Sequence, residues 1–372
     1  MLSTNVVYVM MAFIVSAVLA MIVIPRLLVI AKEHSLYDVH DKRKTHVGAV
    51  PRIGGVSFVP GILLSMMLTF SMFFIYADSH TSQTLYPTIP YFFLFICGLL
   101  LLYLGGIKDD LVGMEYHYKF MIQVIASVFV VCSGLQINNL FGLFGIYELS
   151  PWIGMPLTVL ALVFIINAMN LIDGMDGLAS GISIFALSIY GMLFLTHGLW
   201  VYAVLAYSTV GVLAPFFYYN VFGQAQHGSK LFMGDSGSLT LGLILGYLAI
   251  RYLSVEQGFY NVEHSTLVVA LSPLLLPALD VLRVILYRAR HGKGLFEADR
   301  SHIYHKLLDM GLSSSIALIF LVSGAITFCF MNFVLMRFMG AMYVFLTDII
   351  LWSALNIYIS RKTKKKRGIV SG

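Results

Sequence analysis

Charged residues are scarce in this chain. Only 11% of its 372 residues are charged, 18 residues are acidic, and 59% are hydrophobic. Soluble domains carry about 25% charged residues, so this composition excludes an ordinary soluble fold. It predicts an all-α, polytopic integral membrane protein, because each spanning helix needs about 20 mostly apolar residues.

Cysteine is also rare. Cys97, Cys132 and Cys329 all lie inside apolar runs, without the CxxC or Cys/His spacing of a metal site. We expect them to pack as small apolar residues. The first apolar stretch is too long for the core of a signal peptide and lacks a small-residue cleavage site, so it is predicted to stay as a helix.

Eleven apolar stretches are predicted to cross a membrane. The fifth and sixth are separated only by Asp-Gly-Met-Asp-Gly, a break that is tolerated at membrane depth where it lines a polar cavity. We expect one transmembrane domain over 1–360 and a basic tail over 361–372. The stretches are 6–25, 56–76, 91–107, 120–137, 155–172, 178–197, 200–221, 238–255, 266–287, 312–333 and 340–360.

Lysine and arginine give this arrangement a predicted orientation. With eleven spans, all 23 basic residues except Arg251 and Arg337 fall on one side. Basic loops are retained in the cytoplasm, so the amino terminus is predicted outside and the carboxyl terminus inside. Three clusters of acidic residues fall on the same cytoplasmic face, where ionisable groups next to apolar helices indicate a functional site.

The first cluster lies in 103–113, where Asp109 and Asp110 follow two glycines. Neighbouring carboxylates repel one another, so one of them can hold a proton or bind a metal ion. A solvated helix end is the simpler alternative, although Lys119 and the membrane border lie close by.

The second cluster lies in 167–181. Asn167, Asn170 and Asp173 recur every three residues on one helix face, and Asp176 extends the series. A hydrogen-bond network between packed helices would explain such a series. The glycines around Asp176 favour instead a close approach of backbone to a ligand.

The third cluster, 231–242, opens the eighth predicted helix. Asp235 lies among glycines and serines there. Free amides at a helix amino terminus bind anions, and a carboxylate suits a hard cation. An N-cap would explain one such residue but not the group, so the segment predicts a site for magnesium and a diphosphate.

Two further segments carry basic groups. His302 and His305 lie in 298–308, where contact with phosphate or proton transfer is favoured over zinc because no third ligand has suitable spacing. Asp280 and Arg283 are predicted to form an ion pair one helical turn apart. The basic loop 38–55 is either a topology signal or a phosphate contact through Lys44, His46 and Arg52.

Taken together, the segments KDDLVG, NAMNLIDGMDGLA, FMGDSGS, PRIGG and DRSHIYH resemble the polyprenyl-phosphate N-acetylhexosamine-1-phosphate transferase family over 36–310. The similarity is greatest to its bacterial undecaprenyl-phosphate N-acetylglucosamine-1-phosphate transferase branch. The branch that makes phospho-N-acetylmuramoyl-pentapeptide lipids for peptidoglycan is the alternative.

The resemblance implies a reaction in the bacterial inner membrane. A UDP-N-acetyl sugar and undecaprenyl phosphate give a lipid diphosphate sugar and UMP, the first membrane step of cell-surface polysaccharides such as O-antigen or teichoic acid. The implied cofactor is Mg²⁺, with Mn²⁺ as a substitute. A single-step attack by the lipid phosphate is favoured over a covalent intermediate on Asp110.

The resemblance matches eight positions to the family: Asp109, Asp110, Lys119, Asn170, Asp173, Asp176, Asn220 and Asp235. The other site residues are assigned from their type and surroundings. Catalytic roles fall to Asp109, Asp110, Asp173, Asp176 and His302, metal binding to Asn170 and Asp235, and substrate binding to Lys44, Lys119, Asn167, Asn220, Arg300 and His305. One position departs from the pattern: Tyr304 stands where the branch has the middle histidine of His-Ile-His-His. Tyrosine is not a cation near neutral pH, so that histidine's role does not transfer.

A protein of another functional class, an ion-coupled membrane transporter, is the remaining alternative. An ion-coupled transporter would place acidic residues near the membrane midplane in two related halves. Here the acidic clusters lie at one face and no repeat is apparent. The sequence leaves open the sugar, the polyprenyl length and the oligomeric state, a homodimer being one option.

Overall fold

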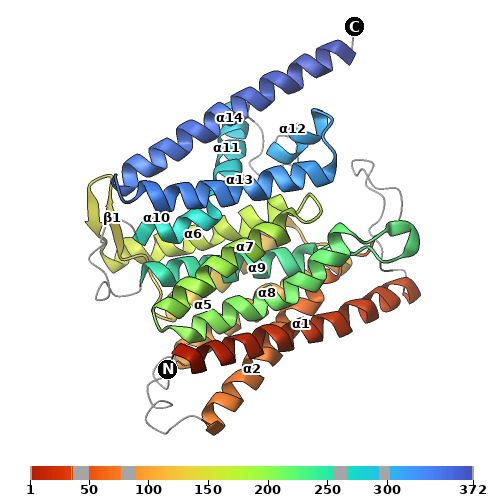
Figure 1. Ribbon diagram of the computed structural model, residues 1–372, viewed down its shortest axis with the longest axis vertical. Helices are drawn as coiled ribbons and strands as arrows, with labels where there is room; N and C mark the ends of the chain where they lie inside the picture. The colour runs from red at the N-terminus through yellow and green to blue at the C-terminus, as the bar shows by residue number, and fades with distance from the viewer. Residues whose placement is uncertain are drawn as a thin grey trace.

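The computed structural model describes residues 2–34, 36, 50–76, 89–254, 266–292 and 302–370. Ten helices within these residues are long and apolar enough to span a membrane, and Figure 1 shows them packed side by side. The predicted polytopic, helical architecture is therefore confirmed. Ten rather than eleven spans reach full length, because α5, the fourth predicted span, has only 17 residues.

The chain order of the elements is as follows. The helices are α1 (Leu2–Glu33), α2 (Phe58–Tyr76), α4 (Ile89–Val112), α5 (Tyr116–Cys132), α6 (Pro151–Ile172), α7 (Leu178–Thr196), α8 (Trp200–Val221), α9 (Gly234–Leu253), α10 (Thr266–Leu271), α11 (Leu275–Arg290), α12 (Ile303–Asp309), α13 (Ser314–Leu335) and α14 (Ala341–Val370). Three 3₁₀ segments are η1 (Gly54–Ser57), η3 (Ala225–His227) and η5 (Ser272–Leu274), and the strands are β1 (Asn139–Leu143) and β2 (Ile146–Glu148).

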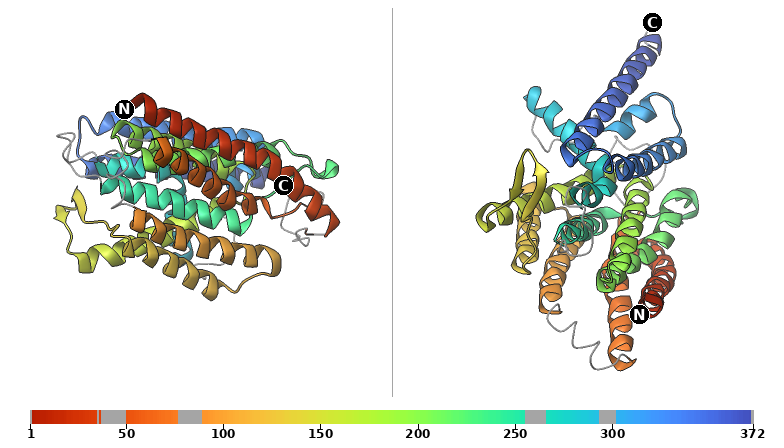
Figure 2. Two further views of the ribbon diagram at one scale, coloured as in Figure 1. Left: turned by 90° about the horizontal axis from the view of Figure 1, so that it is seen from below. Right: turned by 60° about the vertical axis from the view of Figure 1, so that its left-hand side comes forward.

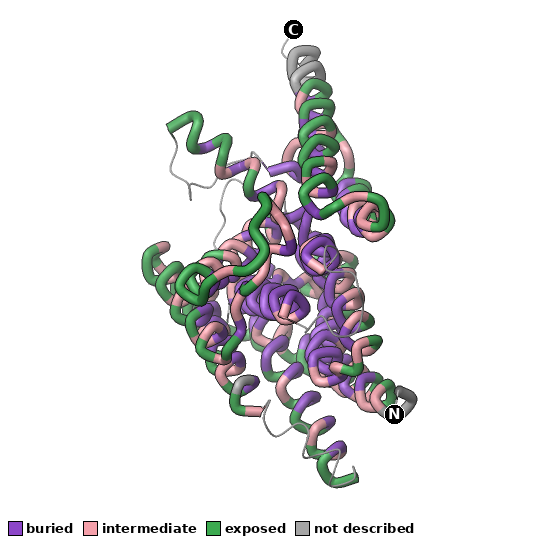
Figure 3. Tube along the Cα trace, turned by 90° about the vertical axis from the view of Figure 1, so that its left-hand side faces the viewer, coloured by how far each residue is buried: buried purple, intermediate pink, exposed green. Residues whose placement is uncertain are grey.

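Helix α9 forms the centre of the bundle. Nearly all of its residues are buried, and α4, α6 and α7 pack around it. The left view of Figure 2 shows α9 between neighbours on both sides, and Figure 3 shows that buried residues concentrate in the middle of the molecule. Because α9 begins with the Gly-Asp-Ser-Gly segment, this packing places Asp235 at one end of the core.

The ninth predicted span is interrupted. The 3₁₀ segment η5 separates α10 from α11, and it contains Pro273. A proline lacks the amide hydrogen that a continuous helix would use, so the break is local in origin. Helix α11 thereby leaves the direction of α10 and carries Asp280 and Arg283.

A β-hairpin corrects the purely helical prediction. Strands β1 and β2 pair antiparallel between α5 and α6, at the opposite end of these helices from Lys119 and Asp173. The side chains of β2 are exposed, whereas those of β1 are half-buried or buried, and Phe141 is 4% exposed. Strand β1 therefore packs against the core beside α10 and α14, whereas β2 lies on the surface.

Helices α13 and α14 lie at the edge of the molecule. Large apolar side chains such as Ile319 and Ile350 are exposed on them, as expected for faces that contact lipid. Helix α14 diverges from α13 (Figure 1; Figure 2, right). It also continues to Val370, so part of the predicted basic tail is helical.

Candidate active site

Three helix ends bring acidic and basic groups together. Asp109 and Asp110 lie in the last turn of α4, Lys119 in the first turn of α5 and Asp235 in the first turn of α9. The Lys119 Nζ atom lies 3.0 Å from Asp109 Oδ2 and 2.7 Å from Asp235 Oδ1. One ammonium group thus partly neutralises two carboxylates that are more than 120 positions apart in the sequence.

Asp110 has a different contact from its neighbour. Its carboxylate accepts hydrogen bonds from the backbone amides of Asp235, at 2.6 Å, and Ser236, at 3.0 Å. These amides open α9 and have no partner within the helix, and a negative charge at a helix amino terminus is favourable. Gly234 permits the approach because a Cβ atom there would lie only 2.7 Å from both oxygens of Asp110. Asp110 therefore caps α9 from another helix.

Glycines allow these segments to approach closely. A Cβ atom on Gly106 would overlap the backbone of Asp235 and Ser236, and one on Gly55 would overlap the backbone of Gly237. Backbone hydrogen bonds join the two loops, from the Gly55 amide to the Met233 carbonyl at 2.8 Å among others. The Pro-Arg-Ile-Gly-Gly segment thus braces the start of α9.

The two asparagines of α6 have separate surroundings. The Asn170 side chain donates hydrogen bonds to Asp235 Oδ1 and, at 2.8 Å, to Ser238 Oγ. Asn167 instead donates to Gln123 of α5, at 2.5 Å, and to the Val163 carbonyl. Asn170 therefore lies within the carboxylate cluster, whereas Asn167 has the helix-packing contacts that were the alternative prediction.

A tight turn between α6 and α7, which we call the acidic turn (173–177), adds two more carboxylates. Lys230 Nζ lies 2.6 Å from Asp176 Oδ2. The buried Asn220 side chain accepts a hydrogen bond from the Gly177 amide, at 2.6 Å, and donates one to the Leu231 carbonyl, at 2.8 Å. Desolvation by the surrounding protein, and repulsion by Asp235 and Asp176, raise the pKa of Asp173 well above its usual value, against the attraction of Arg52.

His302 belongs to a second, buried group. Its Nδ1 atom lies 2.9 Å from Asp280 Oδ2, and Asp280 Oδ1 accepts a hydrogen bond from Arg283 at 2.8 Å. The predicted ion pair of Asp280 and Arg283 is present. Its extension to His302 was missed, because the two residues are 22 positions apart and no spacing rule connects them.

The ring of His305 lies beside that of Tyr304, with centroids 4.1 Å apart and the ring planes tilted by 35°. Lys44, His46 and Arg300 lie outside the described residues, so the structure gives no position for these predicted contacts.

Metal binding can be judged from the donor atoms. No group of three or more His, Cys, Asp or Glu residues capable of holding a metal ion occurs in the described part of the chain. Asp235, Asn170 and Ser238 nevertheless supply hard oxygen atoms close together. Mg²⁺ is usually held by one or two carboxylates, with substrate phosphates and water completing its shell. The oxygen and nitrogen of an amide are interchangeable assignments; with the Asn170 amide turned over, its oxygen would face Asp235 and Ser238, and this donor set would fit the ion.

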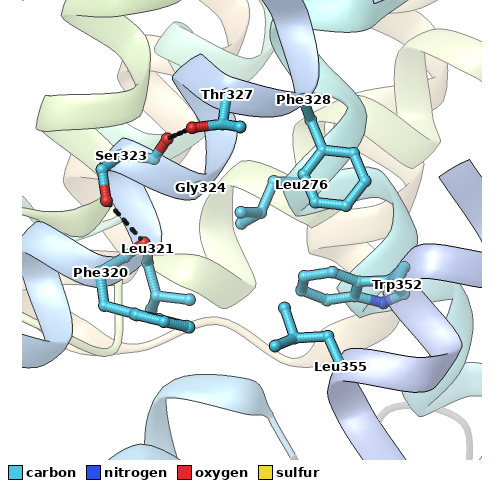
Figure 4. A pocket seen from close by; sticks show the side chains of 9 residues that line it. All are labelled: Leu276, Phe320, Leu321, Ser323, Gly324, Thr327, Phe328, Trp352 and Leu355. Atoms are coloured by element: carbon cyan, nitrogen blue, oxygen red, sulfur yellow. Dashed lines mark hydrogen bonds between the residues drawn. The ribbon is translucent and has the colours of Figure 1, made fainter. Parts of the chain in front are cut away.

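A cavity of about 240 Å³ lies elsewhere, between α11, α13 and α14. Figure 4 shows Leu276, Phe328, Trp352 and Leu355 pointing toward one another around it. None of the predicted site residues is among the residues lining this cavity. The polar cluster is therefore the candidate active site.

Comparison with known proteins identifies the family of this chain. The sequence profile of the family described as Glycosyl transferase family 4 matches residues 92–253. A protein of Bacillus subtilis (strain 168), named "Probable undecaprenyl-phosphate N-acetylglucosaminyl 1-phosphate transferase", is 31% identical over 326 residues, which cover 87% of this chain and 84% of that protein. This chain belongs to that family.

Two further relatives extend the similarity. An undecaprenyl-phosphate alpha-N-acetylglucosaminyl 1-phosphate transferase of Yersinia pestis is 27% identical over 80% of this chain and 76% of its own length. A decaprenyl-phosphate N-acetylglucosaminephosphotransferase of Mycolicibacterium smegmatis is 31% identical over 77% and 72%. The family predicted from the ordered motifs is confirmed. The part of this chain that matches the family profile contains both the carboxylate cluster and the acidic turn, whereas His302 lies beyond its end.

Proposed function

We propose that this member of glycosyl transferase family 4 transfers N-acetylglucosamine-1-phosphate from UDP-N-acetylglucosamine to undecaprenyl phosphate and releases UMP. The observation that carries the proposal is the convergence of Asp109, Asp235 and Lys119 beside the acidic turn at one end of the bundle. The names of the three relatives support the lipid and sugar classes. We place the site at the cytoplasmic face of the bacterial inner membrane, as a first step of cell-surface polysaccharide synthesis.

The transfer is a substitution at phosphorus. An oxygen of the lipid phosphate forms a bond to the β-phosphorus of the UDP-sugar, and the bond from that phosphorus to the bridging oxygen breaks, so that the electron pair leaves with UMP. Such a reaction depends chiefly on positioning and on neutralising charge. Lys119 and Lys230 have ammonium groups at the two sides of the site and suit contact with phosphate oxygens.

A bound Mg²⁺ ion, held by Asp235, Asn170 and Ser238, would neutralise diphosphate charge and stabilise the departing phosphate. Asp109 suits the role of orienting the lipid phosphate or accepting its last proton, because its described ion pair is with the side chain of Lys119 rather than with backbone amides. Both oxygens of Asp110 already accept amides of α9. That contact supports single-step attack over a covalent intermediate on Asp110.

The decisive experiment measures UMP release by the purified protein with undecaprenyl phosphate, Mg²⁺ and separate UDP-sugars. We expect turnover with UDP-N-acetylglucosamine, its loss in excess chelator and its recovery with Mg²⁺ or Mn²⁺. Asp235→Asn should abolish turnover, because an amide lacks the negative charge that binds the metal ion. Its melting temperature in detergent is the control for folding.

The same panel separates the alternatives. Turnover with UDP-N-acetylmuramoyl-pentapeptide and with no other UDP-sugar would assign the protein to the peptidoglycan branch. Full activity in excess chelator would refute the metal proposal, and the absence of UMP with every sugar would refute the transferase proposal in favour of a carrier.

A further inference from the structure

Tyr304 reaches the acidic turn from a separate part of the fold. Its side chain is 6% exposed, and its hydroxyl occupies the space that a Cβ atom on Gly174 would need. The backbone of Gly174 does not have a positive φ, so its conformation is open to other residues. The neighbouring phenol, rather than backbone strain, is what excludes a side chain at position 174.

The helix that carries Tyr304 is itself held in place. His302, just before α12, is bound to Asp280 of α11. On the other side, Lys306 donates a hydrogen bond to Ser360 of α14 at 3.0 Å, and its carbonyl accepts one from Thr363 at 3.3 Å. Because α12 is fixed to both neighbours, Tyr304 cannot easily retreat from the turn.

The acidic turn therefore has supports on three sides. Asn220 binds the Gly177 amide, Lys230 pairs with Asp176, and Tyr304 contacts Gly174. The first two are polar contacts at the far end of the turn, whereas Tyr304 fills the space next to Asp173. Displacing Tyr304 would remove the support next to Asp173, the residue of the turn that adjoins α6.

We propose that Tyr304 is a positioning residue that fixes the acidic turn, and through it Asp173 and Asp176, for the binding of the UDP-sugar. The inference rests on the proposed function of this site and adds a residue to it. Tyr304 acts through Gly174 and touches none of the reacting atoms in this account. Histidine at position 304 would be too short to reach Gly174, so tyrosine is suited to this contact.

A double-mutant cycle between positions 174 and 304 tests the proposal. Gly174→Ala should raise KM for UDP-N-acetylglucosamine and lower kcat/KM by about 100-fold, the cost of a misplacement near 1 Å. Tyr304→His alone should also raise KM for UDP-N-acetylglucosamine, because the turn loses its support next to Asp173. In this background the new methyl group at position 174 has room. Gly174→Ala should then change kcat/KM by no more than about twofold, the range within which independent substitutions add.

Gly324→Ala is the matched control. A Cβ atom there would lie 3.6 Å from Leu276, an ordinary contact, and α13 carries it outside the site. It should leave kcat/KM unchanged with either residue at 304. An equal loss from Gly174→Ala in both backgrounds would overturn the proposal. If Gly174→Ala alone fails to fold, recovery of folding in the double variant supports the contact, and failure of both variants refutes it.

Melting temperatures in detergent give a second cycle that needs no activity. Coupling between positions 174 and 304 should appear there too, with the double variant more stable than the sum of single changes predicts. If the natural protein releases no UMP, the proposed function fails, and this cycle alone decides whether Tyr304 holds the turn. Additive melting temperatures would then reject it.

Discussion

Asp109 and Asp110 are neighbours in sequence with different environments. Asp110 accepts two backbone amides of α9, whereas Asp109 pairs with Lys119. A hydrogen bond to a charged group contributes about 1.5–3 kcal/mol to stability. Substituting the two carboxylates one at a time is therefore expected to distinguish an effect on stability from an effect on catalysis.

We predict that Asp110→Asn lowers the free energy of unfolding by about 1–3 kcal/mol, because the amide group cannot accept both backbone hydrogen bonds. Asp109→Asn should change unfolding little and lower turnover by about 10²–10⁴-fold, as for a positioned acid–base group. Unfolding in detergent and UMP release measure the two effects. Equal stability of the two variants would contradict the capping role of Asp110.

At the scale of elements, the approach of α4 to α9 depends on one glycine of a pair. A Cβ atom on Gly106 would overlap backbone atoms of α9, which cannot rotate away. A Cβ atom on Gly105 would meet only the end of the Ile122 side chain, at 3.1 Å. The two positions are therefore a matched pair for testing this packing.

Gly106→Ala should lower stability by about 1–3 kcal/mol, the usual cost of overpacking, and should also reduce turnover because Asp235 moves with α9. Gly105→Ala should have a smaller effect on both, since a side chain can adjust. Melting temperature and UMP release compare them. A larger loss from Gly105→Ala would show that α4 and α9 meet differently.

Local sequence patterns predicted much of the fold and of the site. Apolar stretches gave the helices, and counting spans placed Asp109, Asp173 and Asp235 at one end. Partners between helices could not be predicted in this way, because they depend on how helices pack rather than on spacing. The capping role of Asp110 and the contact of His302 with Asp280 are of this kind. The β-hairpin was missed because its strands are too short to give a periodic signal.

At the scale of the whole molecule, the orientation in the membrane is a prediction from charge. Val112 lies at the end of α4 that carries the site and is 76% exposed. Ser150 is exposed at the opposite end, between the hairpin and α6. Single cysteines at these two positions therefore report on opposite faces, once the three native cysteines are replaced.

We expect Ser150→Cys to react with a membrane-impermeant maleimide in intact cells, after opening of any outer membrane. Val112→Cys should react only after the inner membrane is permeabilised, because basic loops are retained in the cytoplasm. A permeant maleimide controls for accessibility at both positions. Labelling of Val112→Cys from outside would invert the orientation and remove the site from the cytoplasmic pool of UDP-sugars.

The length of α6 matches the thickness of a membrane. Its 22 residues span about 33 Å at 1.5 Å per residue, close to the roughly 30 Å thickness of the hydrocarbon core. Trp152 lies at one end, where an exposed indole prefers the lipid–water border, and Asp173 follows the other end. We therefore expect the helix to hold the acidic turn at the depth of the lipid phosphate groups in the leaflet opposite Trp152. Adding or deleting one helical turn in α6 should move the acidic turn by about 5.4 Å, out of register with the phosphate of the proposed lipid substrate at the membrane surface.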